Sequence, residues 1–163
     1  MNEAVTRTLI LPEVSNDTPL ESELVAALPG LEKGTRPDWG RMNASQMLRH
    51  CSWFTDLYLG RSEVPCWTRW VSRFAGPPFL RRFLTQTRGE TPRNLGTLRL
   101  LRIREKMDLD FLKERSRLAQ CLLEVEALEG TVCHSIYGPM NARDVRAVVR
   151  HHTAHHFHQF GLL

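Results

Sequence analysis

Residues 141–160 have the sequence NARDVRAVVRHHTAHHFHQF, and this stretch decides which fold and which site we expect. Asn141 is a suitable N-cap, and Asp144 stands at the third helical position, where an acid favours a helix start. Apolar side chains and two histidines then recur at steps of three and four residues: Val145, Val149, His152, His156 and Phe160. Such spacing places them on one helix face. The stretch therefore predicts a helix whose core face carries two histidines.

A second stretch begins in the same way. Residues 39–45 (WGRMNAS) match residues 137–143 (YGPMNAR), so each places an aromatic residue, a Gly, a Met and an Asn before a histidine-bearing helix. Asn43 predicts an N-cap completed as a capping box by Gln46, and Gly60 predicts the end of this 43–59 helix. Two interpretations remain open: good helix starts look alike, or two helix pairs are related by a pseudo-twofold axis.

Counting from the two asparagines brings three histidines into register. His50 lies seven residues after Asn43, and His152 and His156 lie eleven and fifteen after Asn141. These offsets differ by four, so the three histidines occupy equivalent faces of their helices. A single histidine on a core face is usually just hydrogen-bonded. An H-x-x-x-H pair with a third aligned histidine instead favours a metal site.

Three histidines would suit a divalent metal ion, with Zn or Ni expected first and Fe, Mn or Cu as alternatives. Three protein ligands leave coordination positions open for water or substrate, and such an ion lowers the pKa of a water or thiol bound there. The pair His151 and His155 has the same spacing. It continues a row through Asp144 and Val148, which we predict to lie on the flank or surface.

The rest of the chain predicts an all-α four-helix bundle with a long crossover connection. Helices are expected at 18–29, with Thr18 as N-cap, and at 108–128, where apolar residues recur at helical spacing: Phe111, Leu118, Leu122 and Val125. Strand-like alternation is scarce, and residues 129–139 are expected to be a connection. We predict a single domain over 1–163, with a lead-in at 1–17 and a basic crossover at 61–105.

The net charge of +4 is concentrated in that crossover: residues 62–104 carry nine arginines and only two acids. Trp67 and Trp70 among these arginines could stack on nucleic-acid bases. We favour a half-buried amphipathic crossover and therefore disfavour nucleic acid, while an arginine-lined mouth for an acidic thiol is a third use. No run approaches the ~18 apolar residues of a membrane span, and no secretory signal begins the chain, so we expect a cytoplasmic protein without membrane association.

The four cysteines contain no C-x-x-C motif, which argues against a zinc ribbon or a thioredoxin-like site. Cys51 directly follows His50, but neighbouring helical residues point about 100° apart. We therefore predict that Cys51 is a small core residue. Tyr58, Asp56 and Gln159 are candidates for supporting contacts around the histidines.

The set WGRMNASQMLRHC, HSIYGPMNARDV and RHHTAHHFHQFG resembles the DinB/YfiT-like superfamily, over residues 37–60 and 105–163. The closest likeness is to a bacterial branch known only as a domain of unknown function. The resemblance implies a four-helix bundle with a metal held by His50, His152 and His156. Relatives include bacillithiol- or mycothiol-dependent transferases and a maleylpyruvate isomerase. An acidic residue is common in this branch where Ala154 stands here.

These observations predict a metal-dependent enzyme, with a thiol-dependent transferase as the specific hypothesis. Its partners would be a small-molecule thiol and an electrophilic substrate. One alternative is a non-catalytic metal-binding or stress-associated protein, and another is a basic nucleic-acid interaction module. A homodimer is left open.

Overall fold

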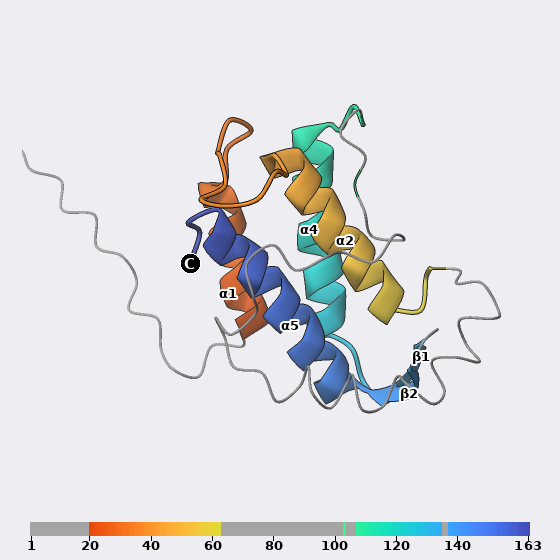
Figure 1. Ribbon diagram of the computed structural model, residues 1–163. Coiled ribbons are helices and arrows are strands. Elements are labelled where there is room, and N and C mark those ends of the chain that lie inside the picture. The colour runs from red at the N-terminus through yellow and green to blue at the C-terminus, as the bar shows by residue number, and fades with distance from the viewer. Residues whose placement is uncertain (1–19, 63–102, 104–106, 135–136) are drawn as a thin grey trace, which may run out of the picture.

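The computed structural model describes residues 20–62, 103, 107–134 and 137–163 (Figure 1). Its helices have the following bounds: α1, Leu20–Ala27; a 3-10 turn, Leu28–Gly30; α2, Ala44–Tyr58; α4, Phe111–Glu126; and α5, Ala142–Gln159. Each end of the four α-helices lies within three residues of its predicted position. The four predicted helices are therefore confirmed.

The all-α prediction is wrong, because the segment before α5 forms a β-hairpin. Strands β1 (Thr131–His134) and β2 (Gly138–Asn141) pair antiparallel, with Thr131 opposite Asn141 and His134 opposite Gly138. β-Branched Thr131 and Val132 favour extended backbone, and Gly138 has a φ of 75°, which suits the turn. The described residues thus combine four α-helices with a two-stranded sheet.

The predicted asparagine caps are confirmed. The Asn43 side chain accepts from the Gln46 backbone N–H at 2.9 Å, and the Gln46 side chain accepts from the Asn43 N–H at 2.9 Å. Asn141, the last residue of β2, accepts from the Asp144 N–H at 2.8 Å. Asp110 caps α4 in a similar way. The proposed cap at Thr18 lies outside the described residues.

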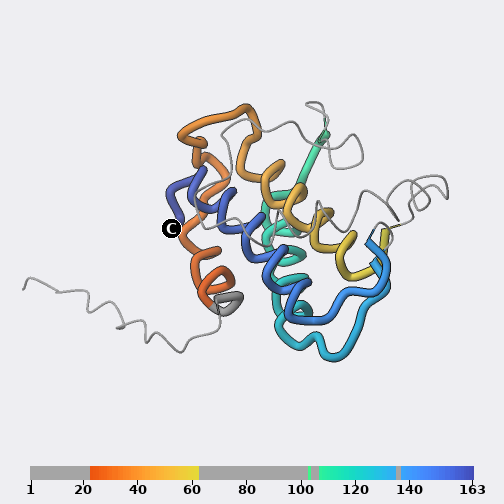
Figure 2. Tube along the Cα trace, turned by 60° about the horizontal axis from the view of Figure 1, so that its bottom comes forward, coloured from red at the N-terminus to blue at the C-terminus, as the bar shows by residue number. Residues whose placement is uncertain are grey.

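The four helices enclose one apolar core. Helix α2 packs against α4 and α5, and α1 packs against the same two helices (Figures 1 and 2). Apolar residues of α2, α4 and α5 face this core, and the following side chains are buried: Met47, Phe54, Leu57, Phe111, Leu118, Leu122, Val125, Val145, Val149 and Phe160. Burying a side chain of this size contributes roughly 1.5–3 kcal/mol. This packing holds α2 and α5 side by side, with the hairpin at the N-terminal end of α5.

Ion pairs fix α2 against α4. Asp56 accepts from the Arg117 guanidinium at 2.6 Å, and buried Glu114 pairs with Arg49. Breaking a buried pair is costly because it leaves one charge uncompensated. These contacts hold α2, and with it His50, at a defined position.

Some predictions fall on residues that the structure does not describe. They include the lead-in at 1–17 and, in the basic crossover, residues 63–102 with Trp67 and Trp70. Within the described part of the chain, no helix has both the length and the apolar character needed to cross a bilayer.

Candidate metal centre

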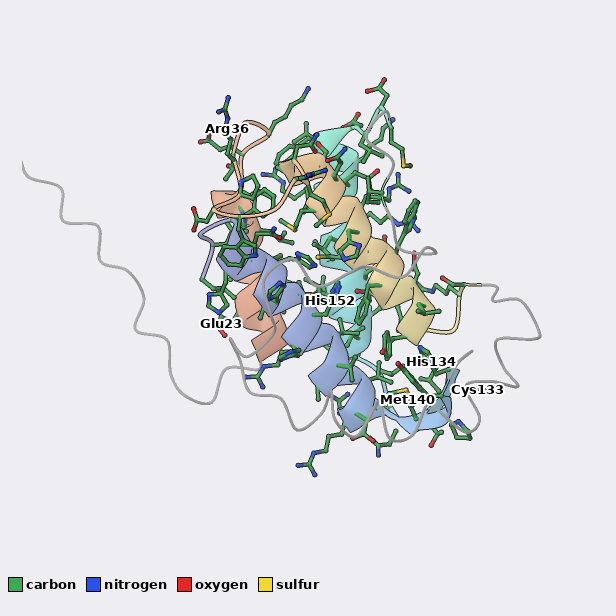
Figure 3. All side chains as sticks on the ribbon, viewed as in Figure 1. Glu23, Arg36, Cys133, His134, Met140 and His152 are labelled. Carbon is green, nitrogen blue, oxygen red and sulfur yellow. The ribbon has the colours of Figure 1, made fainter. Side chains whose placement is uncertain are left out.

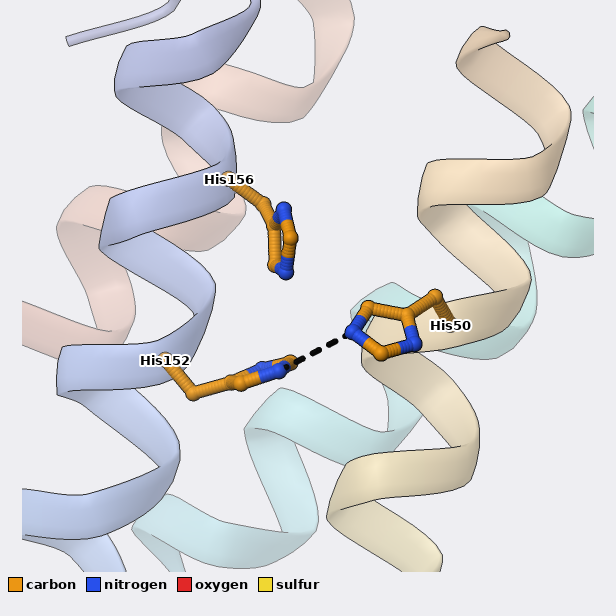
Figure 4. Close-up of side chains that lie close together, drawn as sticks. All are labelled: His50, His152 and His156. Carbon is orange, nitrogen blue, oxygen red and sulfur yellow. Dashed lines mark hydrogen bonds between the residues drawn. The ribbon is translucent and has the colours of Figure 1, made fainter. Parts of the chain in front are cut away.

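Three histidines from two helices converge in the structure. His50 projects from α2, and His152 and His156 project from successive turns of α5 (Figure 4). One ring nitrogen of each lies within 4.8 Å of the others. His50 is buried, whereas His152 and His156 retain at most partial exposure. The expectation that equivalent helix faces would bring these three side chains together is confirmed.

The spacing of the ring nitrogens fits a shared metal ion. The Nε2 atoms of His50 and His152 are 3.1 Å apart. Two nitrogens bound ~2.1 Å from one ion, at cis-octahedral or tetrahedral angles, lie roughly 3.0–3.4 Å from each other. The His50–His152 pair already has this separation, and the His156 nitrogen lies within 4.8 Å of both. The donor set therefore suits a divalent cation.

Burial keeps His152 and His156 in the neutral form that binds metals. Burial, together with the nearby His50, lowers the pKa of His156 to about 3, although the hydrogen bond with Gln159 acts in the opposite direction. The pKa of His152 falls well below its usual value, first because the side chain is buried and then because His156 and His50 are close. Both rings are therefore neutral at pH 7, so each carries one N–H and keeps one ring nitrogen with a free lone pair.

Gln159 is the one supporting candidate that the structure brings to the cluster. Its Oε1 atom lies 2.8 Å from Nδ1 of His156, and its amide group donates to the backbone carbonyl of Trp39. Asp56 is instead paired with Arg117. The Tyr58 ring packs against His134, with ring centroids 4.4 Å apart. Tyr58 and Asp56 therefore support other parts of the fold.

Phe54 also contacts the cluster, although the sequence had not indicated a role for it there. Its ring stacks on His152 with centroids 3.6 Å apart and an interplanar angle of 3°. Phe54 lies four residues after His50, and this spacing alone would have placed it beside the predicted ligand. It forms an apolar wall that restricts the His152 ring.

The other residues near the cluster have structural roles. Cys51 is fully buried, its thiol lies 3.8 Å from the Met47 sulfur, and burial raises its pKa, so it is a core residue as predicted. The His155 ring packs edge-on against Trp39, and His158 bonds to the Leu163 carbonyl at 2.9 Å. Among the described residues the cluster contains only the three predicted histidines, with no Asp, Glu or Cys.

A further buried histidine belongs to the hairpin rather than to the cluster (Figure 3). His134 accepts from the Tyr137 N–H at 3.0 Å through Nδ1, and burial lowers its pKa to about 4. Sequence analysis missed it because a histidine at the end of a four-residue strand has no distinctive pattern. Ala154 is buried in the hydrophobic core. This chain thus has an apolar contact at that position.

Fold and site together define a helical protein with a β-hairpin and a three-histidine cluster that could hold a metal ion. The chain belongs to the DUF1569 family, whose description is "Protein of unknown function (DUF1569)" and whose model matches residues 19–161. The match spans all four helices and all three histidines. It agrees with the likeness to a domain of unknown function and does not confirm the DinB/YfiT-like superfamily. Comparison with curated proteins and with solved structures found no match.

Proposed function

We propose that this protein is a metal-dependent enzyme that binds one divalent ion through His50, His152 and His156. The observation that carries the proposal is the convergence of three histidines from two helices at ligand spacing. Neutral imidazoles bind Zn or Ni well, with Fe, Mn and Cu as alternatives. They do not offset the charge of the ion. A site of this kind therefore favours an anion in its remaining positions.

The chain would hold the ion between α2 and α5, and the ion would supply the activation. When bound, a divalent ion at this site would lower the pKa of a water or thiol there and polarise an electrophile. Phe54 packs against His152, and Gln159 holds His156, so neither ring turns freely. Among the described residues, no carboxylate joins the cluster to act as a general base. In the proposed enzyme, activation would therefore depend on the metal.

For the substrates we propose a small-molecule thiol and an electrophile. Two features support this choice. The sequence resembles families of thiol-dependent transferases, and residues 62–104 carry nine arginines that would attract an acidic thiol. Cys51 is buried and its thiol pKa is raised, so Cys51 does not supply the nucleophile at the histidine cluster.

A second candidate is a non-catalytic metal-binding protein. The absence of a carboxylate from the cluster, among the described residues, favours this alternative, because most enzymes with such sites also use a positioned acid or base. The nucleic-acid alternative depended on the basic segment, most of which the structure does not describe. It stays a prediction from sequence.

A thiol-conjugation screen separates the enzyme from the binding protein. Protein purified without a nickel column would be loaded with Zn or Ni and assayed with low-molecular-weight thiols and electrophiles. We expect conjugation by wild type and by the His151→Ala control, and none by His50→Ala. Conjugation that persists after metal removal would contradict the proposal. Stoichiometric metal without turnover of any thiol would support the non-catalytic candidate instead.

A further inference from the structure

Gln159 contacts both the histidine cluster and the loop that precedes α2. It is the last residue of α5 and is 5% exposed. Its side-chain amide donates to the Trp39 carbonyl, and its own backbone carbonyl accepts from the Asp38 N–H at 2.8 Å. Two consecutive loop residues therefore hold Gln159 by its main chain and its side chain. This double attachment leaves the amide group in one orientation.

The orientation of the amide determines where the proton of His156 lies. A backbone carbonyl can only accept a hydrogen bond, so the NH₂ end of the Gln159 amide must face Trp39. The Oε1 end then faces Nδ1 of His156 at 2.8 Å, and this oxygen can also only accept. Nδ1 must therefore carry the proton. A neutral imidazole has one N–H, so Nε2 retains its lone pair.

We infer that Gln159 is a positioning residue that fixes His156 in the Nδ1–H tautomer, with Nε2 ready to bind a metal ion. The tautomer itself follows from the hydrogen bonds, whereas the consequence for metal binding rests on the proposed metal site. Metal-binding histidines usually donate their second N–H to a fixed acceptor, which orients the ring and raises the basicity of the ligating nitrogen. Gln159 gives His156 such an acceptor before any ion arrives.

His152 provides an internal contrast. Its Nδ1 atom is buried and has no hydrogen-bond partner among the described residues, and its Nε2 lies 3.1 Å from Nε2 of His50. One of these two Nε2 atoms must carry the shared proton in the hydrogen bond. That ring has to change tautomer before its Nε2 can bind a metal, whereas His156 does not. His156 could therefore bind the ion in the tautomer it already has, whereas one ring of the His50–His152 pair must first move its proton to the other nitrogen.

The test measures the tautomer in metal-free protein and, separately, the affinity for a metal. Long-range proton–nitrogen NMR spectra of the metal-free wild type should show His156 with a protonated Nδ1 and an unprotonated Nε2. Gln159→Met removes the acceptor, so we expect mixed tautomers of His156 and a Co²⁺ dissociation constant about 10–100-fold higher. Gln159→Glu keeps an acceptor for Nδ1–H while losing the donor to Trp39, and should preserve the tautomer. Gln120→Met alters an exposed glutamine on α4, and serves as the matched control.

The two readouts separate this inference from the proposed function. If the wild type binds no Co²⁺ but shows the Nδ1–H tautomer, which Gln159→Met loses, the inference stands and the metal proposal fails. A wild-type His156 protonated at Nε2 would overturn the inference, and so would a Gln159→Met protein with an unchanged tautomer. A Gln159→Met protein that fails to fold leaves the decision to Gln159→Glu, in which a changed tautomer would overturn it.

Discussion

Helices α2 and α5 start within similar seven-residue stretches, which are identical at four positions, but they are preceded by different structures. In both, an asparagine caps the helix three residues after a glycine with positive φ, which is 87° at Gly40 and 75° at Gly138. A loop leads into α2, whereas strand β2 leads into α5. The shared motif therefore determines where each helix begins. The structure that precedes it is determined by longer-range packing.

The common start explains why the histidines meet. Each cap fixes the phase of its helix, so residues at offsets of seven, eleven and fifteen from the asparagines share a direction. Packing of α2 against α5 then places the two faces together. Substitutions in α2 can be compared with the equivalent substitutions in α5, and similar effects would show that both helices contribute to one site.

Removing one ligand from either helix should have the largest effect. We expect His50→Ala on α2 and His156→Ala on α5 each to abolish stoichiometric metal binding, because two imidazoles hold a divalent ion far less tightly than three. The measurement is metal content after dialysis. His151→Ala and His158→Ala should keep the metal. Equal loss from all four variants would instead indicate a chelating patch spread over the surface.

Acid should destabilise the metal-free protein through two buried histidines, His156 on α5 and His134 on β1. The pKa of His156 is about 3 and that of His134 about 4 in the folded chain, below the ~6.5 of an unfolded histidine. As pH falls through 6.5, the unfolded chain binds protons that the folded chain does not, so the free energy of unfolding decreases. Each pKa unit of difference corresponds to ~1.4 kcal/mol, and the contribution is fully present above about pH 7.

Urea unfolding of metal-free protein between pH 4 and pH 8 checks this dependence. In His134→Gln, the free energy of unfolding should depend less steeply on pH between pH 4 and pH 6. The variant loses the contribution of His134 and keeps that of the histidine cluster. A free energy of unfolding that stays constant or rises from pH 7 to pH 5 would refute the assignment of buried neutral histidines.

The sequence sufficed for elements that depend on local signals. Asn43 with Gln46 determines a helix start, and the apolar stripe from Phe111 to Val125 determines a helix and its buried face. The three candidate ligands followed from the same information, because helical phase is local. The convergence of His50 with His152 and His156 then required only that the two faces pack together.

Long-range contacts account for what the sequence did not predict. The strands of the hairpin have four residues each, and β2 contains Gly138 and Pro139, which weaken any strand pattern. Their pairing stabilises the extended backbone. Gln159 finds its acceptor in the Trp39 carbonyl, 120 residues away. No local pattern encodes such a contact.

The paired glycines should contribute similar amounts to stability. Gly40→Ala and Gly138→Ala each force an alanine into the left-handed region, at a cost of roughly 1–2 kcal/mol. A methyl group at Gly138 would meet no atom within 4 Å, so its cost is conformational alone. Chemical denaturation measures both. An alanine tolerated without loss at either position would show that the two starts are not equivalent.

The two caps should have the smallest effects. Asn43→Ala and Asn141→Ala each remove a side-chain acceptor at a helix start, and we expect each to lower the free energy of unfolding by about 1 kcal/mol. The double variant should lose the sum, because the sites share no partner. Urea midpoints measure this. If only one of the two substitutions lowers the free energy of unfolding, or if their effects are far from additive, the two helix starts are not equivalent.

The central claim is that three histidines from two similarly started helices hold one metal ion. Elemental analysis of protein purified without a nickel column tests it most directly, with His50→Ala prepared in parallel. We expect close to one divalent ion per chain in wild type and almost none in the variant. A folded wild-type protein that carries no more metal than His50→Ala, even after incubation with Zn or Ni, would contradict it.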